Sequence, residues 1–404
     1  MWLRYGLAQN NQLVAIEDVP SGKTNLVCPY CGHELVAKKG LVKEHHFAHA
    51  SDTCYMVIKR EPRELPTLPL YDSFDIFLSG RELENLNKLW HRHKAHKNGI
   101  DRLEVLPAFT KEKLLESARH LNSNVRYGVY QFTALGKIPV KALALTHFNG
   151  VQEPLIVQKL AQFEAAIFDN KGSVLAQPSL SFRLTDLRIY LAQLRKIWRS
   201  TLYFLEVQAD GQVLYKIGIT SRPITKRLTE IRQDLRAHFQ NTTIKVLGTW
   251  SSRGNVEKYF KYKYSDFSYP IGSLTEYFKF DSLEDAIVVK SDLERMKPKV
   301  LSQIEQGIVE NEASPIEELL SHPLSQPTRS LTTAVPADAR GIEYLTQTKL
   351  MQVFLSRPSS QLALEALKQG CSLPEAAQLA CVPVNVARKV LAVMHHSNEL
   401  VERE

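Results

Sequence analysis

The sequence lacks the features that mark secreted and membrane-spanning proteins. No apolar run approaches the roughly 18 residues that cross a bilayer, and the N-terminal segment has neither a continuous apolar core nor a small-residue cleavage site. Only five cysteines occur in 404 residues, too few and too unevenly spaced for a disulfide framework. We therefore expect a cytoplasmic protein that does not contact a membrane.

Internal repeats are also absent, and the composition is that of an ordinary globular protein. Hydrophobic residues make up 44% of the chain and charged residues 23%. A chain of 404 residues is too long for one ordinary core, so we expect two to four domains. The net charge of +8 favours a polyanionic partner.

Composition shifts predict an α+β multidomain protein made of five segments. A cysteine- and histidine-rich unit occupies residues 1–60, and a mixed α/β segment without a recognisable motif covers 75–200. Alternating strand and helix patterns span 200–295. Proline, serine and threonine with little apolar periodicity predict a flexible linker over 311–342, and a helical domain follows over 343–404.

Within the middle segment the hydrophobic pattern changes period. Leucines at 83, 86 and 89 predict a helix, and residues 184–198 have helical periodicity with a basic face. The stretch IPVKALALTHF at 138–148 is more typical of a strand.

Residues 201–220, TLYFLEVQADGQVLYKIGIT, predict a β-hairpin that turns at Asp210-Gly211. Period-two alternation places Tyr203 and Phe204 on opposite faces. Gly218 permits a close backbone approach, either by a substrate phosphate or by a packed helix.

Three further elements follow the hairpin. Apolar residues at 228, 231 and 235 predict an amphipathic helix, and Arg227, in its first turn, is expected to point away from that stripe. A second helix carries Glu257, and LTEYFKF reads as a closing strand.

The ordered set TLY, KIG (Lys216–Gly218), Arg227, Glu257 and TEYF resembles the GIY-YIG nuclease superfamily. It is most similar to the phage-associated branch, in which the second signature is KIG and an EWF-like triplet lies near the end. The resemblance implies a small α/β nuclease domain that hydrolyses phosphodiester bonds with a divalent cation.

The resemblance also implies a role for each site residue. Glu257 would hold the cation, Mg²⁺, because a hard carboxylate oxygen suits it. Tyr203 would orient or deprotonate the attacking water, and Arg227 would contact the scissile phosphate. Lys216 takes the place of the second tyrosine of the parent pattern and could bind phosphate directly. Lys261 stands where related proteins often carry histidine.

Basic residues interleaved with tyrosines surround this set, which predicts a track for a nucleic-acid backbone, DNA in the first place. The expected contacts are Gly218, Lys226, Arg232, Lys258 and Lys261. A structural interpretation competes with this one. Tyr203 could be a packed strand tyrosine, Glu257 an ordinary helix glutamate, and the basic run a solvated face.

The N-terminal segment carries cysteine and histidine at metal-ligand spacing. Cys28-x2-Cys31 is followed by His46-x2-His49 and then by Cys54. A mixed sulfur and nitrogen set favours structural Zn²⁺. The fourth ligand beside Cys28, Cys31 and His49 is either His46 or Cys54.

His33 and His45 are expected to be bystanders to the zinc site. The alternative is a cluster of free thiols and surface histidines. The elements CPYCG, KKG and HFAH, in this order, resemble the N-terminal zinc-knuckle region of competence-protein CoiA-like proteins. In that family the knuckle precedes a different nuclease domain.

The C-terminal segment divides into three predicted helices. Gly370 is a C-cap candidate, and Ser372 with Glu375 forms a capping box. The pattern resembles a helix-turn-helix of the resolvase or sigma-factor-like kind, and a helical protein–protein module is the alternative. The residues expected to face a DNA groove are Asn385, Arg388 and Lys389.

Together these features favour a metal-dependent DNA endonuclease from phage, mobile-element or defence biology. Two other functions remain open. One is a non-catalytic DNA-binding protein or regulator built on a degenerate nuclease fold. The other is a scaffold whose modules bind proteins.

Overall fold

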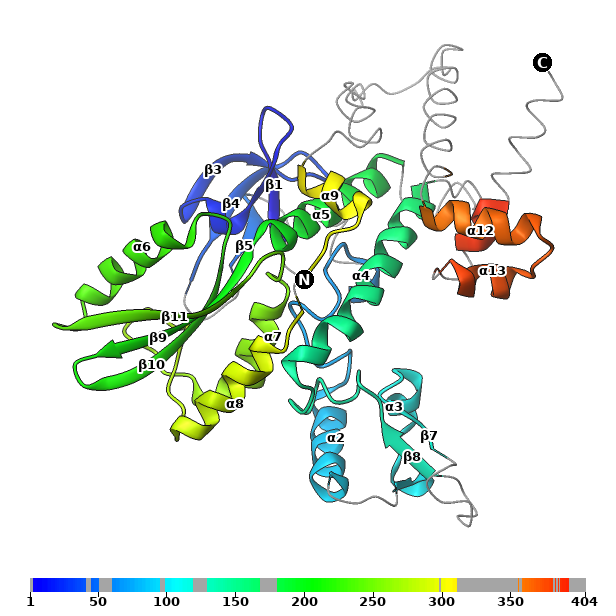
Figure 1. Ribbon diagram of the computed structural model, residues 1–404. Helices are drawn as coiled ribbons and strands as arrows, with labels where there is room; N and C mark the ends of the chain where they lie inside the picture. Colours follow the sequence, from blue (N-terminus) through cyan, green and yellow to red (C-terminus); the bar gives the residue numbers. More distant parts are fainter. Residues whose placement is uncertain are drawn as a thin grey trace. The chain divides into compact units, whose positions relative to one another are not determined.

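The computed structural model describes most of the chain (Figure 1), namely residues 3–40, 45–50, 60–94, 99–118, 129–167, 180–297, 299–310, 355, 358–380, 382, 384 and 386–391. The expected linker at 311–342, Cys54 and Asn385 lie outside these residues. The fold class is α+β, as expected, and its sheets are antiparallel. Among the described helices, none is long and apolar enough to cross a membrane.

The chain forms two compact units, and each draws on separate stretches of sequence. One unit comprises residues 1–67, 157–193 and 310–404, and the other comprises 68–156 and 194–309. The long helices α4 (Leu145–Ile167) and α5 (Leu180–Arg199) each contribute to both units. We describe each unit by itself.

A four-stranded antiparallel sheet is the centre of the second unit. Its strands, in the order β11-β9-β10-β12, are β11 (Thr242–Trp250), β9 (Thr201–Ala209), β10 (Gln212–Thr220) and β12 (Tyr277–Phe278). The predicted hairpin is therefore confirmed. Asp210 and Gly211 turn it with φ angles of 45° and 82°, the left-handed pair that a two-residue hairpin turn requires. The Asp210 carboxylate also accepts hydrogen bonds from the backbone of Gln240 and Asn241, just before β11.

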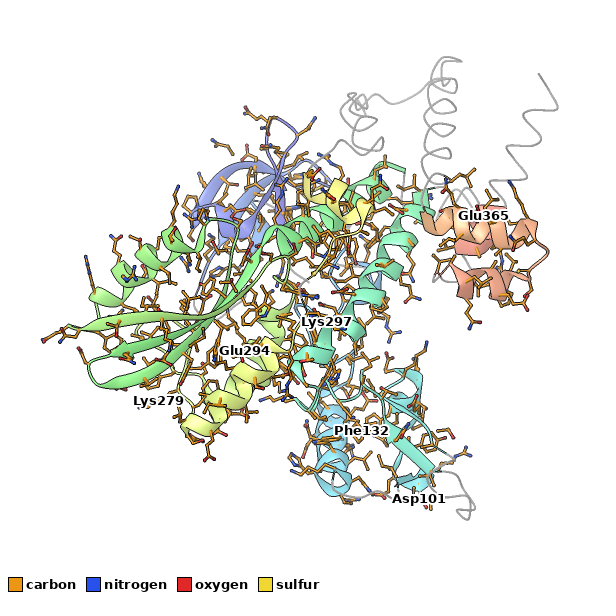
Figure 2. The ribbon with its side chains drawn as sticks, in the orientation of Figure 1. Asp101, Phe132, Lys279, Glu294, Lys297 and Glu365 are labelled. Atoms are coloured by element: carbon orange, nitrogen blue, oxygen red, sulfur yellow. The ribbon has the colours of Figure 1, made fainter. Side chains whose placement is uncertain are left out.

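Helices cover both faces of this sheet. In Figure 1, α6 (Ile224–Arg236) lies along one face, and α7 (Val256–Lys263) and α8 (Leu283–Glu294) lie along the other. Tyr203 packs with the α6 side and Phe204 with the α7 and α8 side, which confirms their predicted alternation. Side chains from both layers fill the space between sheet and helices (Figure 2). Each large apolar side chain buried there contributes about 1.5–3 kcal/mol.

The same unit contains a smaller sheet, with strand order β6-β8-β7, and its own apolar cluster. The predicted helix over leucines 83–89 is α2 (Gly80–His93), which begins with a capping box between Ser79 and Glu82. The remaining elements of this part are β6 (Ile100–Asp101), η3 (Arg102–Glu104), α3 (Pro107–Lys111), β7 (Leu115–Ser117) and β8 (Val129–Phe132).

The expected strand at 138–148 is wrong, because α4 begins at Leu145. The reason is a tertiary cap. The Asp292 carboxylate in α8 accepts hydrogen bonds from the backbone N–H groups of Leu145 and Thr146, at 2.6 and 3.1 Å. The first N–H groups of a helix have no hydrogen-bond partner within the helix. A side chain that is close in sequence usually accepts from them. The residues around Leu145 give no signal for this helix start, because the capping residue, Asp292, is distant in the sequence.

The first unit contains a five-stranded antiparallel sheet near the N-terminus and the helices that pack with it. Its strand order is β2-β1-β3-β4-β5. The strands are β1 (Tyr5–Leu7), β2 (Leu13–Ala15), β3 (Gly22–Val27), β4 (Glu34–Lys38) and β5 (His46–His49). Short 3-10 turns occur at η1 (Ile16–Asp18), η2 (Pro62–Glu64) and, in the other unit, η4 (Ser265–Phe267). Helix α9 (Gln303–Glu310) ends at the boundary between the units.

The C-terminal helices also belong to the first unit. Helix α12 (Pro358–Lys368) ends before Gly370, whose φ of 88° fits the predicted C-cap position. The predicted capping box of Ser372 and Glu375 begins α13 (Leu373–Leu379). Small residues let these helices pack closely onto the second half of α4, through Ala161 and Ala165.

Candidate functional site

Tyr203 and Arg227 meet on the α6 side of the sheet. Tyr203 is only 1% exposed, and its hydroxyl accepts a hydrogen bond of 3.3 Å from Arg227 Nε. Arg227 Nη1 donates to Glu230 Oε2 at 2.9 Å. Arg227 therefore points toward the sheet at the edge of the apolar stripe of α6, contrary to the expectation that it would point away. Two bonds fix its guanidinium in one orientation.

In the same unit, a second set of charged side chains links β10, α7 and the residue that precedes β12. Lys216 on β10 donates to Glu276 Oε2 at 2.7 Å, and Lys261 on α7 donates to Glu276 Oε1 at 3.0 Å. Lys261 Nζ also donates to Glu257 Oε1 at 2.9 Å. Each carboxylate oxygen of Glu276 thus accepts a hydrogen bond from a different lysine ammonium group. The ammonium of Lys216 also lies 4.4 Å from the ring centre of Tyr277.

Burial and ion pairing shift the pKa values of this network in different directions. Burial raises the pKa of the Tyr203 phenol, and Arg227 offsets only part of that shift. Burial alone would raise the pKa of Glu276, but Lys216 and Lys261 outweigh it and lower the pKa to about 2. Burial lowers the pKa of Lys216, although Glu276 opposes the shift. At neutral pH the tyrosine is therefore neutral and Glu276 is ionised.

Gly218 faces Tyr203 across the hairpin, in register on the neighbouring strand. A Cβ atom added to Gly218 would lie 2.3 Å from the Tyr203 hydroxyl oxygen. Glycine is required here because the tyrosine ring crosses directly over the backbone. The space above Gly218, expected to admit a phosphate or a packed helix, is taken by the side chain of Tyr203.

The four predicted catalytic residues take part in one connected electrostatic environment. Glu257 and Glu276 both act on the phenol of Tyr203 and raise its pKa further. Arg227 in turn acts on Lys216. The sequence reasoning missed Glu276 as a site residue. Its one signal in the sequence is its position as the acid of the TEYF element.

The predicted DNA contacts separate into two groups. Lys226 and Arg232 are exposed on the outer side of α6, as a backbone contact requires. Lys258 instead pairs with Asp72 and lies over the ring of Tyr71. Lys261 is committed to the two glutamates described above.

Residues of the predicted helix-turn-helix also differ in their surroundings. Arg388 is exposed. Lys389 turns inward, because its ammonium donates to the carbonyl of Ala165 in α4 at 2.9 Å. Asn385 lies outside the described residues, so a groove contact by Arg388 and Asn385 stays a prediction.

The first unit brings together three of the predicted metal ligands. One ligand atom each from Cys28, Cys31 and His49 lies within 4.8 Å of the others. Gly32 has a φ of 74° and closes the tight turn between β3 and β4, with its N–H donating to the carbonyl of Cys28 at 2.8 Å. Two sulfurs and one imidazole at this spacing fit Zn²⁺. This cluster could therefore bind zinc.

His46 is not part of the cluster, which corrects its expected role as a possible fourth ligand. It begins β5 opposite Lys38, whereas His49 ends the strand opposite Leu35. Strand alternation also directs the two histidine side chains to opposite faces. His33, expected to be a bystander, is close instead: its Nδ1 lies 3.3 Å from Cys31 Sγ. Cys54, the other candidate, lies outside the described residues.

Comparison with known protein families matches two segments of the chain. Residues 9–56 match the family described as competence protein CoiA, N-terminal domain, which supports the resemblance drawn from the knuckle. Residues 200–296 match the T5orf172 domain, over the sheet unit that carries Tyr203 and Glu257. A match to the GIY-YIG superfamily under that name is not among these findings. No curated protein and no solved structure matches the chain.

Proposed function

We propose that residues 200–296 form a metal-dependent DNA endonuclease domain of the GIY-YIG type. The T5orf172 match suggests a nuclease or a DNA-binding role for this segment. The observation that carries the proposal is the hydrogen bond between Tyr203 and Arg227, on a sheet whose strand β10 is joined to Glu257 through Lys216, Glu276 and Lys261. Phosphodiester hydrolysis needs these three chemistries in one place: a group that orients water, a cation for the phosphate and a carboxylate for a metal.

Glu257 would hold a divalent cation, Mg²⁺, through its carboxylate. When bound, that ion would neutralise phosphate charge and activate a water molecule. Glu257 is only 8% exposed and lies in the first turn of α7. Burial strengthens the attraction between a carboxylate and a cation. The carboxylate is therefore well suited to retain an ion beside the substrate.

Tyr203 would orient the attacking water rather than deprotonate it. Burial raises the pKa of its phenol, so the phenolate needed for a general base is disfavoured at neutral pH. A neutral hydroxyl that already accepts from Arg227 still has its own proton to donate. Of the two roles that the family resemblance leaves open, the raised pKa of the phenol favours orientation.

Arg227 would contact the scissile phosphate. Its bonds to Tyr203 and Glu230 hold the guanidinium plane in place before substrate arrives. Preorganised charge stabilises a transition state without reorganisation at the moment of reaction. A planar guanidinium also matches the geometry of phosphate oxygens.

Lys216 would act indirectly. Its side chain is 4% exposed and its ammonium is bound to Glu276. Direct contact with phosphate, one expectation from the sequence, would require that pair to open. The proposed role of Lys216 is to hold Glu276 in position.

A non-catalytic DNA-binding protein is the second candidate function. The observation that favours it is the same Lys216, which replaces a tyrosine of the parent pattern and is buried in an ion pair. In this case the exposed cations of α6 would bind the DNA backbone, and the T5orf172 segment would serve only for binding.

A cleavage assay with Mg²⁺ on duplex and single-stranded DNA distinguishes the two candidates. The wild type is compared with Glu257→Ala and with Glu294→Ala, an exposed helix glutamate on α8 that serves as control. We expect Glu257→Ala to lose cleavage by about a thousandfold, as for the loss of a main electrostatic group, and the control to retain it. DNA binding that weakens with salt, without cleavage by any variant, would support the second candidate.

A further inference from the structure

The ammonium of Lys261 lies between two carboxylates that come from different parts of the sheet unit. Its Nζ is 2.9 Å from Glu257 Oε1 and 3.0 Å from Glu276 Oε1. Glu257 is in α7, and Glu276 directly precedes β12. One positive nitrogen therefore marks the point where the two carboxylate oxygens converge.

Glu257 is buried and the Glu276 side chain is 36% exposed, and two carboxylates this close would repel each other without a cation between them. The position of Lys261 Nζ, between the two carboxylates, is therefore one where a positive charge is favourable. Oxygen ligands from two carboxylates are a set that Mg²⁺ and Mn²⁺ accept. A protein ammonium and a divalent ion cannot both occupy it.

Glu276 would remain in place if Lys261 moved away. Its other oxygen, Oε2, accepts from Lys216 at 2.7 Å, and the side chain of Lys216 is almost fully buried. The side chain of Lys261 is 31% exposed, whereas that of Lys216 is 4% exposed. Of the two lysines, Lys261 is therefore the one with solvent access through which to leave Glu276.

We propose that Glu257 and Glu276 together are the ligand pair for the divalent cation, and that Lys261 is a built-in competitor for that position. The cation binds only when the ammonium of Lys261 leaves Glu257. Lys216 is a positioning residue that keeps Glu276 at the site. This inference rests on the proposed function in one respect, the assignment of Glu257 as a metal ligand.

Binding of Mn²⁺ to the full-length protein, followed by electron paramagnetic resonance, tests the inference without any activity measurement. We expect Lys261→Met to bind Mn²⁺ at least tenfold more tightly than the wild type. The control is Lys290→Met on α8, which removes a lysine from an exposed pair with Glu294 at the same spacing of four residues. It should leave Mn²⁺ affinity unchanged.

Two double variants identify the ligands. In the Lys261→Met background, Glu276→Gln and Glu257→Gln should each weaken Mn²⁺ binding by at least tenfold. Lys261→Gln repeats the test with a side chain that can still donate hydrogen bonds to both carboxylates, in case the methionine variant does not fold. Thermal unfolding of every variant provides the folding check.

Three outcomes separate this inference from the proposed function. Unchanged Mn²⁺ affinity in folded Lys261→Met and Lys261→Gln would overturn the competitor role. Tight binding that depends on Glu257 but not on Glu276 would overturn the ligand pair and leave the proposed function standing. Tight binding that survives Glu257→Gln would remove the metal ligand on which the proposed function itself depends.

Discussion

The two candidate sites of this protein are built in opposite ways. The cysteine–histidine cluster takes its residues from the turn between β3 and β4, which carries Cys28 and Cys31, and from the end of β5, which carries His49. The charged network collects its members from β9, β10, α6, α7 and the residue before β12, between Tyr203 and Glu276. The first is a local arrangement of neutral or soft ligands, and the second is a non-local balance of buried charges.

This difference determines which substitutions should disrupt each site. A metal cluster whose ligands are close in sequence depends on the identity of each ligand and on the ion. A network of paired charges depends on every partner being present, because one removed partner leaves another charge buried and unpaired. The predictions below test these two kinds of dependence, beginning with the largest effect.

Cys28→Ser should have the largest effect if the cluster holds zinc, because it removes one of the three residues that could bind the ion. In small zinc-binding folds the ion contributes roughly 10–16 kcal/mol of apparent binding free energy. We expect loss of bound zinc and faster amide exchange in β3, β4 and β5, measured by metal analysis and hydrogen–deuterium exchange. Cys371→Ser, which changes a half-buried cysteine outside the cluster, is the control. A full equivalent of zinc retained by Cys28→Ser would contradict the assignment.

Gly218→Ala should destabilise the hairpin by about 1–3 kcal/mol, as overpacking typically does. The added methyl group would meet the hydroxyl and Cζ of Tyr203 at 2.3 and 2.6 Å. Urea unfolding measures the loss, and Gly150→Ala, inside α4 where a Cβ meets no atom within 4 Å, should instead stabilise by up to about 1 kcal/mol. Tyr203→Leu should recover part of the stability in the double variant. Equal stability of wild type and Gly218→Ala would show that the ring moves freely.

Glu276→Gln should cost about 1–2 kcal/mol, because it weakens charge-assisted hydrogen bonds to buried Lys216. Lys216→Met in the same chain should restore part of it, since no unpaired charge then remains. Chemical unfolding of the single and double variants gives the coupling.

The lowered pKa of Glu276 also predicts that the stability of the folded protein depends on pH. The folded-state pKa of Glu276 is lowered to about 2, whereas an unfolded glutamate has a pKa of about 4.3. Its contribution to stability is therefore fully present above about pH 4.3 and is lost as the pH falls toward 2. In this window the wild type should lose stability more steeply than Glu276→Gln. Parallel curves for the two proteins would argue against the ion pairs.

Replacing Lys226 and Arg232 by alanine should have the smallest effect. Both side chains are exposed on α6, so folding should not change. If each contacts a DNA phosphate, the slope of log affinity against log salt should fall by about 0.9 for each residue. Fluorescence anisotropy at several salt concentrations measures it, with Lys88→Ala on α2 as an exposed control. An unchanged slope would place the DNA contact elsewhere.

Local patterns were predictable where the physical cause was local. The turn at Asp210-Gly211, the capping box of Ser372 and Glu375, and the cysteine turn closed by Gly32 follow from backbone requirements of a few residues. The start of α4 was not predictable, because its cap is Asp292, far along the chain. Roles assigned by sequence order also failed for His46, which strand alternation turns away from His49.

Sequence patterns are sufficient to predict the antiparallel hairpin, the helices α6 and α7, the residue types of both sites, and the spacing of Cys28 and Cys31. Which charges pair depends on the folded arrangement. Glu276 accepts from Lys216 and Lys261, and Arg227 turns to Tyr203, because sheet register and helix packing bring distant residues within 3.3 Å. The energy of an ion pair depends on the distance between the charges and on their burial. Both are set by the folded structure and cannot be read from the sequence.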